Sequence, residues 1–114
     1  MEFVQEKIGD VLVVRLAGKK VTSHEAPELK TALLGFLMGD TRKILFNLKE
    51  VLMMDSTGLG SLLFAIRQAE RYDKDIRFCE MQPKIQFLVR IAHLEDVIDV
   101  YNSEKDALKG FNEE

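Results

Sequence analysis

The sequence has few of the features that mark secreted, membrane-embedded or disulfide-stabilised proteins. It contains one cysteine, Cys79, among 114 residues. A lone cysteine cannot close an internal disulfide, and Cys79 stands in an apolar run, so we expect it to fill space in the core. No apolar run approaches the roughly 20 residues of a membrane-spanning helix, and the acidic, alternating start MEFVQEKIGD is unlike a secretory signal. These absences predict a cytoplasmic protein without a membrane partner.

Clustered positive charge and catalytic patterns are also missing. Lysine and arginine number 16 against 19 aspartates and glutamates, and the formal net charge is -3. Because binding to nucleic-acid phosphates requires clustered basic side chains, we expect no direct nucleic-acid partner. His24 and His93 lie far apart, with no cysteine, histidine or acid at ligand spacing, and Ser56 is not in a Gly-x-Ser-x-Gly turn. We therefore expect no metal, no cofactor and no enzymatic activity.

The first part of the chain has the alternating pattern of two strands. Residues 3–7 and 11–18 are rich in strand-forming residues, and Gly9-Asp10 between them predicts a two-residue hairpin turn. A helix is expected next, because Thr22 and Glu25 have the spacing of a capping box and Pro27 suits a first helical turn.

The rest of the chain alternates between strand and helix patterns. Strands are expected at 43–48, 75–80 and 97–101, with helices reaching to about Tyr72, over 83–93, and after a capping Ser103. This order predicts an α/β fold in one domain spanning residues 1–114. Its sheet would be mixed but mostly parallel, opened by an antiparallel hairpin and packed with about four helices.

The segment MMDSTGLGSLLF, residues 53–64, places two hydroxyls and two glycines where a strand gives way to a helix. A glycine costs roughly 1 kcal/mol in a helix relative to alanine, so Gly58 and Gly60 indicate a tight turn or the close approach of another surface. Met53 and Met54 are expected in the core. At helical spacing, the predicted core stripe is Leu59, Leu62, Leu63, Ile66 and Ala69, and the predicted exposed face is Ser56, Gly60, Phe64, Arg67 and Arg71.

Three interpretations of this segment are compatible with the residues. Asp55 or Ser56 can be a helix cap, with the glycines making the turn. The Gly-x-Gly turn between a strand and a helix, with Glu80 downstream, can also be a nucleotide cradle, although Leu63 occupies the place of the third glycine. Finally, a serine at a helix N-terminus is a favourable position for a phosphate, which would make the surface beside Asp55 strongly acidic.

The segment MMDSTGLG resembles the signature of the bacterial anti-sigma factor antagonists, also called anti-anti-sigma factors, of the STAS domain superfamily. The resemblance extends over nearly the whole chain. Similar segments stand in the same order in that family, namely VVRLAG, SHEAPELK, ILFNLKEV, the proline that begins the 83–93 helix, and LEDVIDVYNSEKDAL.

The resemblance implies a non-enzymatic phosphoprotein that regulates transcription by partner switching. In that family the unmodified antagonist binds an anti-sigma factor with serine kinase activity and frees a sigma factor. The kinase phosphorylates the antagonist, the modified form no longer binds, and a serine phosphatase resets the cycle. Ser56 matches the phosphoacceptor, with Thr57 as the alternative. The implied partner surface, with the exposed helix face added, is Asp55, Ser56, Thr57, Gly58, Gly60, Phe64 and Arg67.

The sequence departs from the family pattern in one segment. Members often have Gly-Glu-Leu/Ile-Asp after the second strand, and residues 19–22, KKVT, stand there instead. Other functions remain open on the sequence, namely a STAS scaffold subunit of a signalling assembly or transport system, or a nucleotide-binding module. A weak homodimer is equally open.

Overall fold

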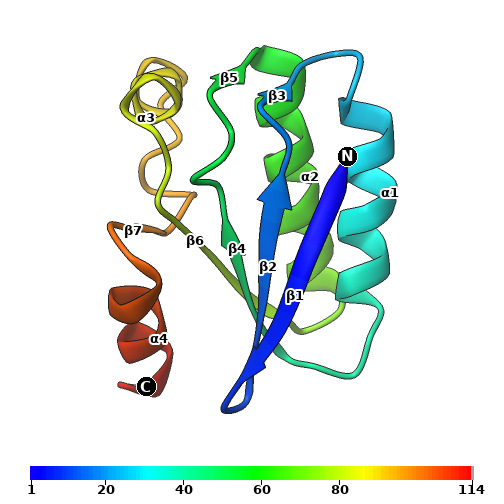
Figure 1. Cartoon of the computed structure of the whole chain (residues 1–114), viewed down its shortest axis with the longest axis vertical. Coiled ribbons are helices and arrows are strands. Elements are labelled where there is room, and N and C mark those ends of the chain that lie inside the picture. Colours follow the sequence, from blue (N-terminus) through cyan, green and yellow to red (C-terminus); the bar gives the residue numbers. More distant parts are fainter. Residues whose placement is uncertain (114) are drawn as a thin grey trace.

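A computed structural model describes residues 1–113 and shows a sheet with helices on both faces (Figure 1). The elements, in chain order, are β1 (Glu2–Ile8), β2 (Val11–Ala17), β3 (Lys20–Val21), α1 (Ala26–Leu37), β4 (Lys43–Asn47), β5 (Met53–Met54), α2 (Ser56–Arg71), β6 (Asp75–Cys79), α3 (Pro83–Ile91), β7 (Val100–Tyr101) and α4 (Glu104–Asn112).

The predicted hairpin opens the chain. Strands β1 and β2 pair antiparallel from Glu2 opposite Ala17 to Ile8 opposite Val11. Gly9 in the connecting turn has a φ of 61°, a left-handed conformation that glycine adopts without steric cost.

The main sheet has the strand order β1-β2-β4-β6-β7, and every pair after the hairpin is parallel. Helices α1 and α2 lie side by side against one face, and α4 lies on the opposite side (Figure 1). This arrangement confirms the predicted α/β fold with a mixed, mostly parallel sheet.

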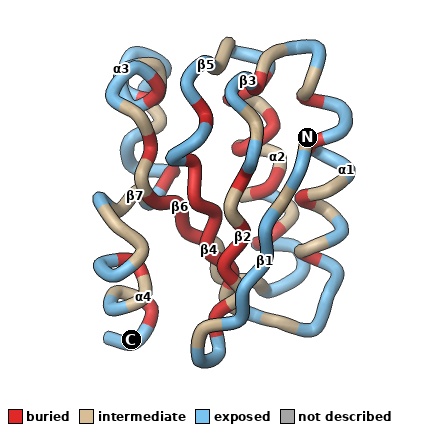
Figure 2. Tube along the Cα trace, in the orientation of Figure 1, coloured by how far each residue is buried: buried red, intermediate tan, exposed pale blue. Residues whose placement is uncertain are grey.

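Alternate residues of the central strands supply two apolar clusters. The larger one packs against α1, α2 and α3, and the smaller one, which includes Cys79, lies beneath Ala107 and Phe111 of α4. Strand β4 is buried along almost its whole length, as Figure 2 shows, because helices cover both of its faces. The core position expected for Cys79 is confirmed, since its side chain is fully buried.

Three local predictions need correction. The predicted strand 97–101 is reduced to β7, and the parallel pair of two-residue strands β3 and β5 was not expected. Helix α1 begins at Ala26 with Glu25, not Thr22, at its N-cap. Half of the predicted capping box still forms, because Glu25 Oε1 accepts hydrogen bonds from the Thr22 backbone N–H at 2.9 Å and from its hydroxyl at 2.8 Å.

The buried face of α2 is rotated relative to the predicted stripe. Its buried residues are Gly58, Leu59, Ser61, Leu62, Ala65 and Ala69, whereas Leu63 and Ile66 are only partly buried. The rotation arises because α2 packs against α1 on one side as well as against the sheet beneath it. The apolar stripe was predicted for a helix that packs against one surface, and it does not describe a helix that packs against two.

Candidate partner-docking site at the start of helix α2

Asp55 organises the start of α2. It is the N-cap residue in an extended conformation, and its Oδ1 accepts a 2.8 Å hydrogen bond from the backbone N–H of Gly58. Its second oxygen, Oδ2, accepts from the backbone N–H of Ser23 at 3.1 Å. The cap interpretation is therefore correct, and the same carboxylate also ties the loop before α1 to the start of α2.

Gly58 permits a close backbone contact inside the molecule. Strand β3 pairs with β5, with Lys20 opposite Met53 and Val21 opposite Met54. A Cβ added to Gly58 would stand 1.9 Å from the carbonyl oxygen of Val21. The first glycine of the segment thus lets β3 lie directly against the first turn of the helix.

The two hydroxyl-bearing residues stand at the surface. Ser56 and Thr57 are the first two residues of α2, and both are exposed. The first turn of a helix has backbone N–H groups without helical partners and the positive end of the helix dipole, which together favour an anion. A phosphate on Ser56 would therefore be tolerated by the helix, next to an Asp55 carboxylate that is already held by two N–H donors.

The face that continues from Ser56 is less exposed than predicted. Gly60 is half-buried, and Arg67 is exposed. The ring of Phe64 is half-buried, which corrects the prediction of an exposed aromatic, because α1 packs beside α2 and the Nζ of Lys30 lies 5.7 Å from the ring centroid.

Sequence reasoning missed two apolar side chains beside this face. Met53 is 55% exposed and Leu52 is 53% exposed, so the prediction that Met53 lies in the core is wrong. Within β5, successive side chains point to opposite faces, and Met54 faces inward while Met53 faces outward. The period-two pattern was the available signal, but a two-residue strand is too short to reveal it.

Leu52 also connects this area to α3. Leu52 and the start of α3 line the same hollow, whose lining residues are Leu52, Gln82, Pro83 and Lys84. On α3, Phe87 and Ile91 are 56% and 57% exposed, one helical turn apart. Apolar surface therefore flanks the start of α2 on the side of α3.

The nucleotide interpretation is not favoured by the geometry. The space beside Gly58 is filled by the carbonyl group of Val21, and Leu63 stands in place of a third glycine. Glu80 does not face the start of α2, because its carboxylate accepts a 2.8 Å hydrogen bond from Asn47 Nδ2.

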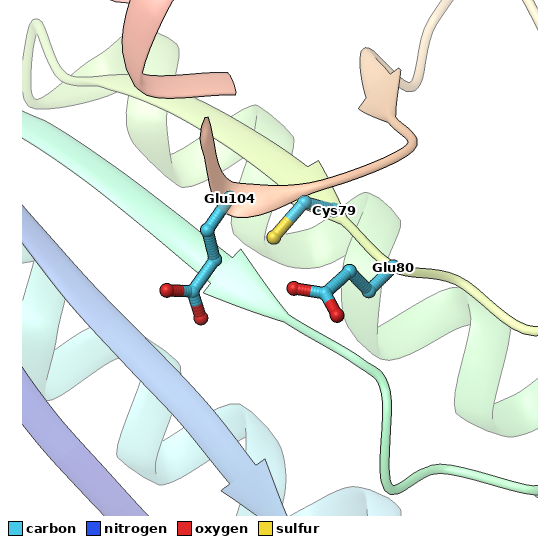
Figure 3. A group of neighbouring side chains, drawn as sticks. All are labelled: Cys79, Glu80 and Glu104. Carbon is cyan, nitrogen blue, oxygen red and sulfur yellow. The ribbon is translucent and has the colours of Figure 1, made fainter. Parts of the chain in front are cut away.

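A separate polar cluster brings together Cys79, Glu80 and Glu104, with ligand-type atoms within 4.8 Å of one another (Figure 3). Glu104 is bound in bidentate fashion by Arg15, at 2.7 and 2.8 Å. The hydrogen bonds from Arg15, and then one from Asn47, hold the pKa of Glu104 below its ordinary value of 4.5.

The thiol in this cluster is kept protonated. Burial, and then the nearby charges of Glu80 and Glu104, raise the pKa of Cys79 to about 12. Since metals bind the thiolate, and since Arg15 and Asn47 already engage the carboxylates, the donor set does not fit a metal ion well. We assign the cluster a structural role, which is to fix the first turn of α4 to the ends of β2 and β4.

Comparison with known proteins identifies the family of this chain. Residues 2–107 match the family model described as "STAS domain". The anti-sigma-B factor antagonist of Staphylococcus aureus is 31% identical over 96 residues, which are 84% of this chain and 85% of that protein. In the part of the chain that the structure describes, the helices are too short or too polar to cross a membrane.

Two solved structures show the same fold. An anti-sigma factor antagonist from Mycobacterium paratuberculosis has a TM-score of 0.84 at 19% identity and covers 96% of this chain and 92% of its own. The Bacillus cell fate determinant SpoIIAA in its phosphorylated form has a TM-score of 0.69 at 20% identity, with 96% and 99% covered. The family model and the staphylococcal relative, together with this shared fold, show that the chain belongs to the STAS domain family, among the anti-sigma factor antagonists.

Proposed function

We propose that this protein releases a sigma factor by docking onto an anti-sigma factor that is also a serine kinase, and that phosphorylation of Ser56 ends the docking. A serine phosphatase would restore the binding form. In this cycle the protein is a regulator and not an enzyme, and it acts in the cytoplasm without a cofactor. The residues 1–114 act as one STAS domain.

The observation that carries the proposal is the exposure of the Ser56 hydroxyl on a helix start that is held together by other groups. Asp55 makes the cap, and Gly58 makes the close contact with Val21. Ser56 contributes nothing to either, so a kinase can modify it without disturbing the fold. Thr57, which is also exposed on the same turn, is the alternative acceptor.

The proposed partner surface follows from which residues the fold leaves accessible. Gly58 is buried and serves the packing of β3, so its contribution to docking is indirect. Direct contacts would come from Ser56, Thr57, Gly60 and Arg67, with the half-buried Phe64 ring at the edge. Asp55 would act mainly by shaping the turn.

The switch follows from charge at close range. A phosphate adds about -1.5 to -2 charges and a bulky group to a surface that docks when it carries a small neutral hydroxyl. Changing binding from nearly complete to nearly absent requires about 5.5 kcal/mol of differential affinity. Lost packing and repulsion by acidic groups of the partner would together supply this difference in binding free energy, because both act directly at the contact.

The segment 19–22 places positive charge next to the proposed surface, in contrast to the acid that family members often have there. Lys20 is exposed on β3 opposite Met53, and Lys19 precedes it, where family members often have an acid. We propose that the partner of this protein carries acidic residues facing these lysines. Such a difference in charge would restrict the protein to its own partner among related kinases.

The proposal is tested first in the native cells. The intact mass of the purified protein should include a singly phosphorylated form modified at Ser56. Tagged wild-type protein and Ser56→Ala should recover a serine kinase that Ser56→Asp does not recover. If no phosphate is found and Ser56→Asp stays in one large, constant complex, the proposal is wrong and a scaffold or transport-associated role replaces it.

A further inference from the structure

Gly58 and Gly60 lie two residues apart in α2, yet their surroundings are opposite. A Cβ on Gly58 would collide with the backbone of Val21, whereas a Cβ on Gly60 would meet no heavy atom of residues 1–113 within 4 Å. The fold of this chain therefore accounts for the first glycine and does not account for the second.

The conformation of Gly60 does not require glycine either. Gly60 is inside the regular helix α2, and the positive φ angles among the described residues occur at Gly9, Asp73, Glu80 and His93. Alanine would fit both the backbone and the space at position 60. It would also favour the helix, because glycine is among the poorest helix formers.

The position of Gly60 relative to Ser56 suggests what lies over it. Residues four apart share one side of a helix, so the half-buried Gly60 lies on the same side as the exposed Ser56. The axial distance between them is about 6 Å. A kinase that takes the Ser56 hydroxyl into its active site must cover this turn.

We propose that Gly60 is the point where the backbone of the anti-sigma factor kinase comes closest to α2. The inference rests on the proposed function, because the occupant of this surface is the same partner. The missing side chain lets a main-chain segment of the kinase lie directly on the helix, between the Ser56 hydroxyl and the edge of the Phe64 ring.

The chain contains a matched control for this inference. Gly35 also lies inside a helix, α1, and a Cβ there would likewise meet no heavy atom within 4 Å among the residues that the structure describes. The two helices run side by side in the same direction (Figure 1). Gly35 lies about 13 Å along α1 from its start, well away from the end where Ser56 lies.

The experiment compares Gly60→Ala, Gly35→Ala and the wild type, using as probe the purified serine kinase identified with the Ser56 variants. Both alanine variants should melt about 4 °C higher than the wild type, because each adds a better helix former without a clash. Calorimetric titration with the kinase should then separate them. Gly60→Ala should bind about tenfold more weakly, while Gly35→Ala should stay within about twofold of the wild type.

A larger substitution makes the readout graded. Gly60→Leu should weaken kinase binding further than Gly60→Ala while keeping the circular dichroism spectrum of the wild type. If the wild type binds the kinase and Gly60→Ala binds equally well, the inference about Gly60 is overturned and the proposed function stands. It is also overturned if Gly60→Ala melts below the wild type, since Gly60 would then have an internal role. If the wild type neither binds nor is phosphorylated by any serine kinase, the proposed function itself fails.

Discussion

The carbonyl oxygen of Val21 lies 1.9 Å from the point where a Cβ on Gly58 would stand. This contact joins β3, which follows the hairpin, to the first turn of α2, which carries the proposed phosphoacceptor. Because the hindering atom belongs to the backbone, it cannot rotate away as a flexible side chain could. The start of α2 is thus held in place by β3 and by the Asp55 cap together.

Gly58→Ala should be strongly destabilising. The added methyl group would force β3 and α2 apart, and we expect a loss of about 3 kcal/mol in the free energy of unfolding. Urea denaturation of the variant and the wild type would measure it. A free energy within about 0.5 kcal/mol of the wild type would mean that the contact between Val21 and Gly58 relaxes at little cost.

Ser56→Asp and Ser56→Ala should have equal stability but opposite binding. Neither changes the cap or the core, so both should unfold within about 0.5 kcal/mol of the wild type. Only the charged variant should lose the kinase. Thr57→Asp places the same charge one residue along the helix, within the proposed partner surface, so it should weaken kinase binding as well. If Ser56→Asp bound the kinase as tightly as the wild type, a charge switch at Ser56 would be excluded.

Glu104→Gln should destabilise the protein in a pH-dependent manner. Because Arg15 and Asn47 lower the folded-state pKa of Glu104, its ionised form contributes stability above its unfolded pKa of 4.5. That contribution is lost as the pH falls through the lower, folded-state value. We expect Glu104→Gln to cost about 1–2 kcal/mol at pH 7 and progressively less below pH 4.5.

Glu6→Gln provides the matched control for Glu104. Glu6 also pairs with Arg15, at 2.9 Å, but its side chain is 54% exposed, whereas that of Glu104 is 21% exposed. An exposed ion pair contributes little, so Glu6→Gln should change the stability by less than about 0.5 kcal/mol. Equal effects of the two substitutions at pH 7 would contradict the structural role assigned to Glu104.

Cys79 should resist alkylation as long as the protein is folded. Its thiol is fully buried and its pKa is raised to about 12, so at pH 8 it is both inaccessible and protonated. Mass spectrometry after iodoacetamide treatment should show no modification in buffer and complete modification in denaturant. Rapid labelling of the native protein would indicate that α4 opens readily from the sheet.

Much of the fold could be predicted from the sequence, because its signals are local. Gly9-Asp10 selects a hairpin turn, residues 43–48 are apolar on both faces as in a covered central strand, and Ser103 caps the last helix by accepting from the Asp106 N–H. The motif around Ser56 gave the family, and the family model and relatives confirm it.

The details of the site depended on contacts between segments far apart in the sequence. Hydrophobic spacing could not show that α1 covers part of Phe64, or that Met53 faces outward from a strand that exists only because β3 pairs with it. The sequence alone determined the order of the four helices and of the longer strands, and it placed Ser56 at the exposed start of a helix, since these follow from turn chemistry and periodicity. Only the tertiary structure distinguished Gly58 from Gly60, because what a missing side chain makes room for depends on the distant backbone packed against it.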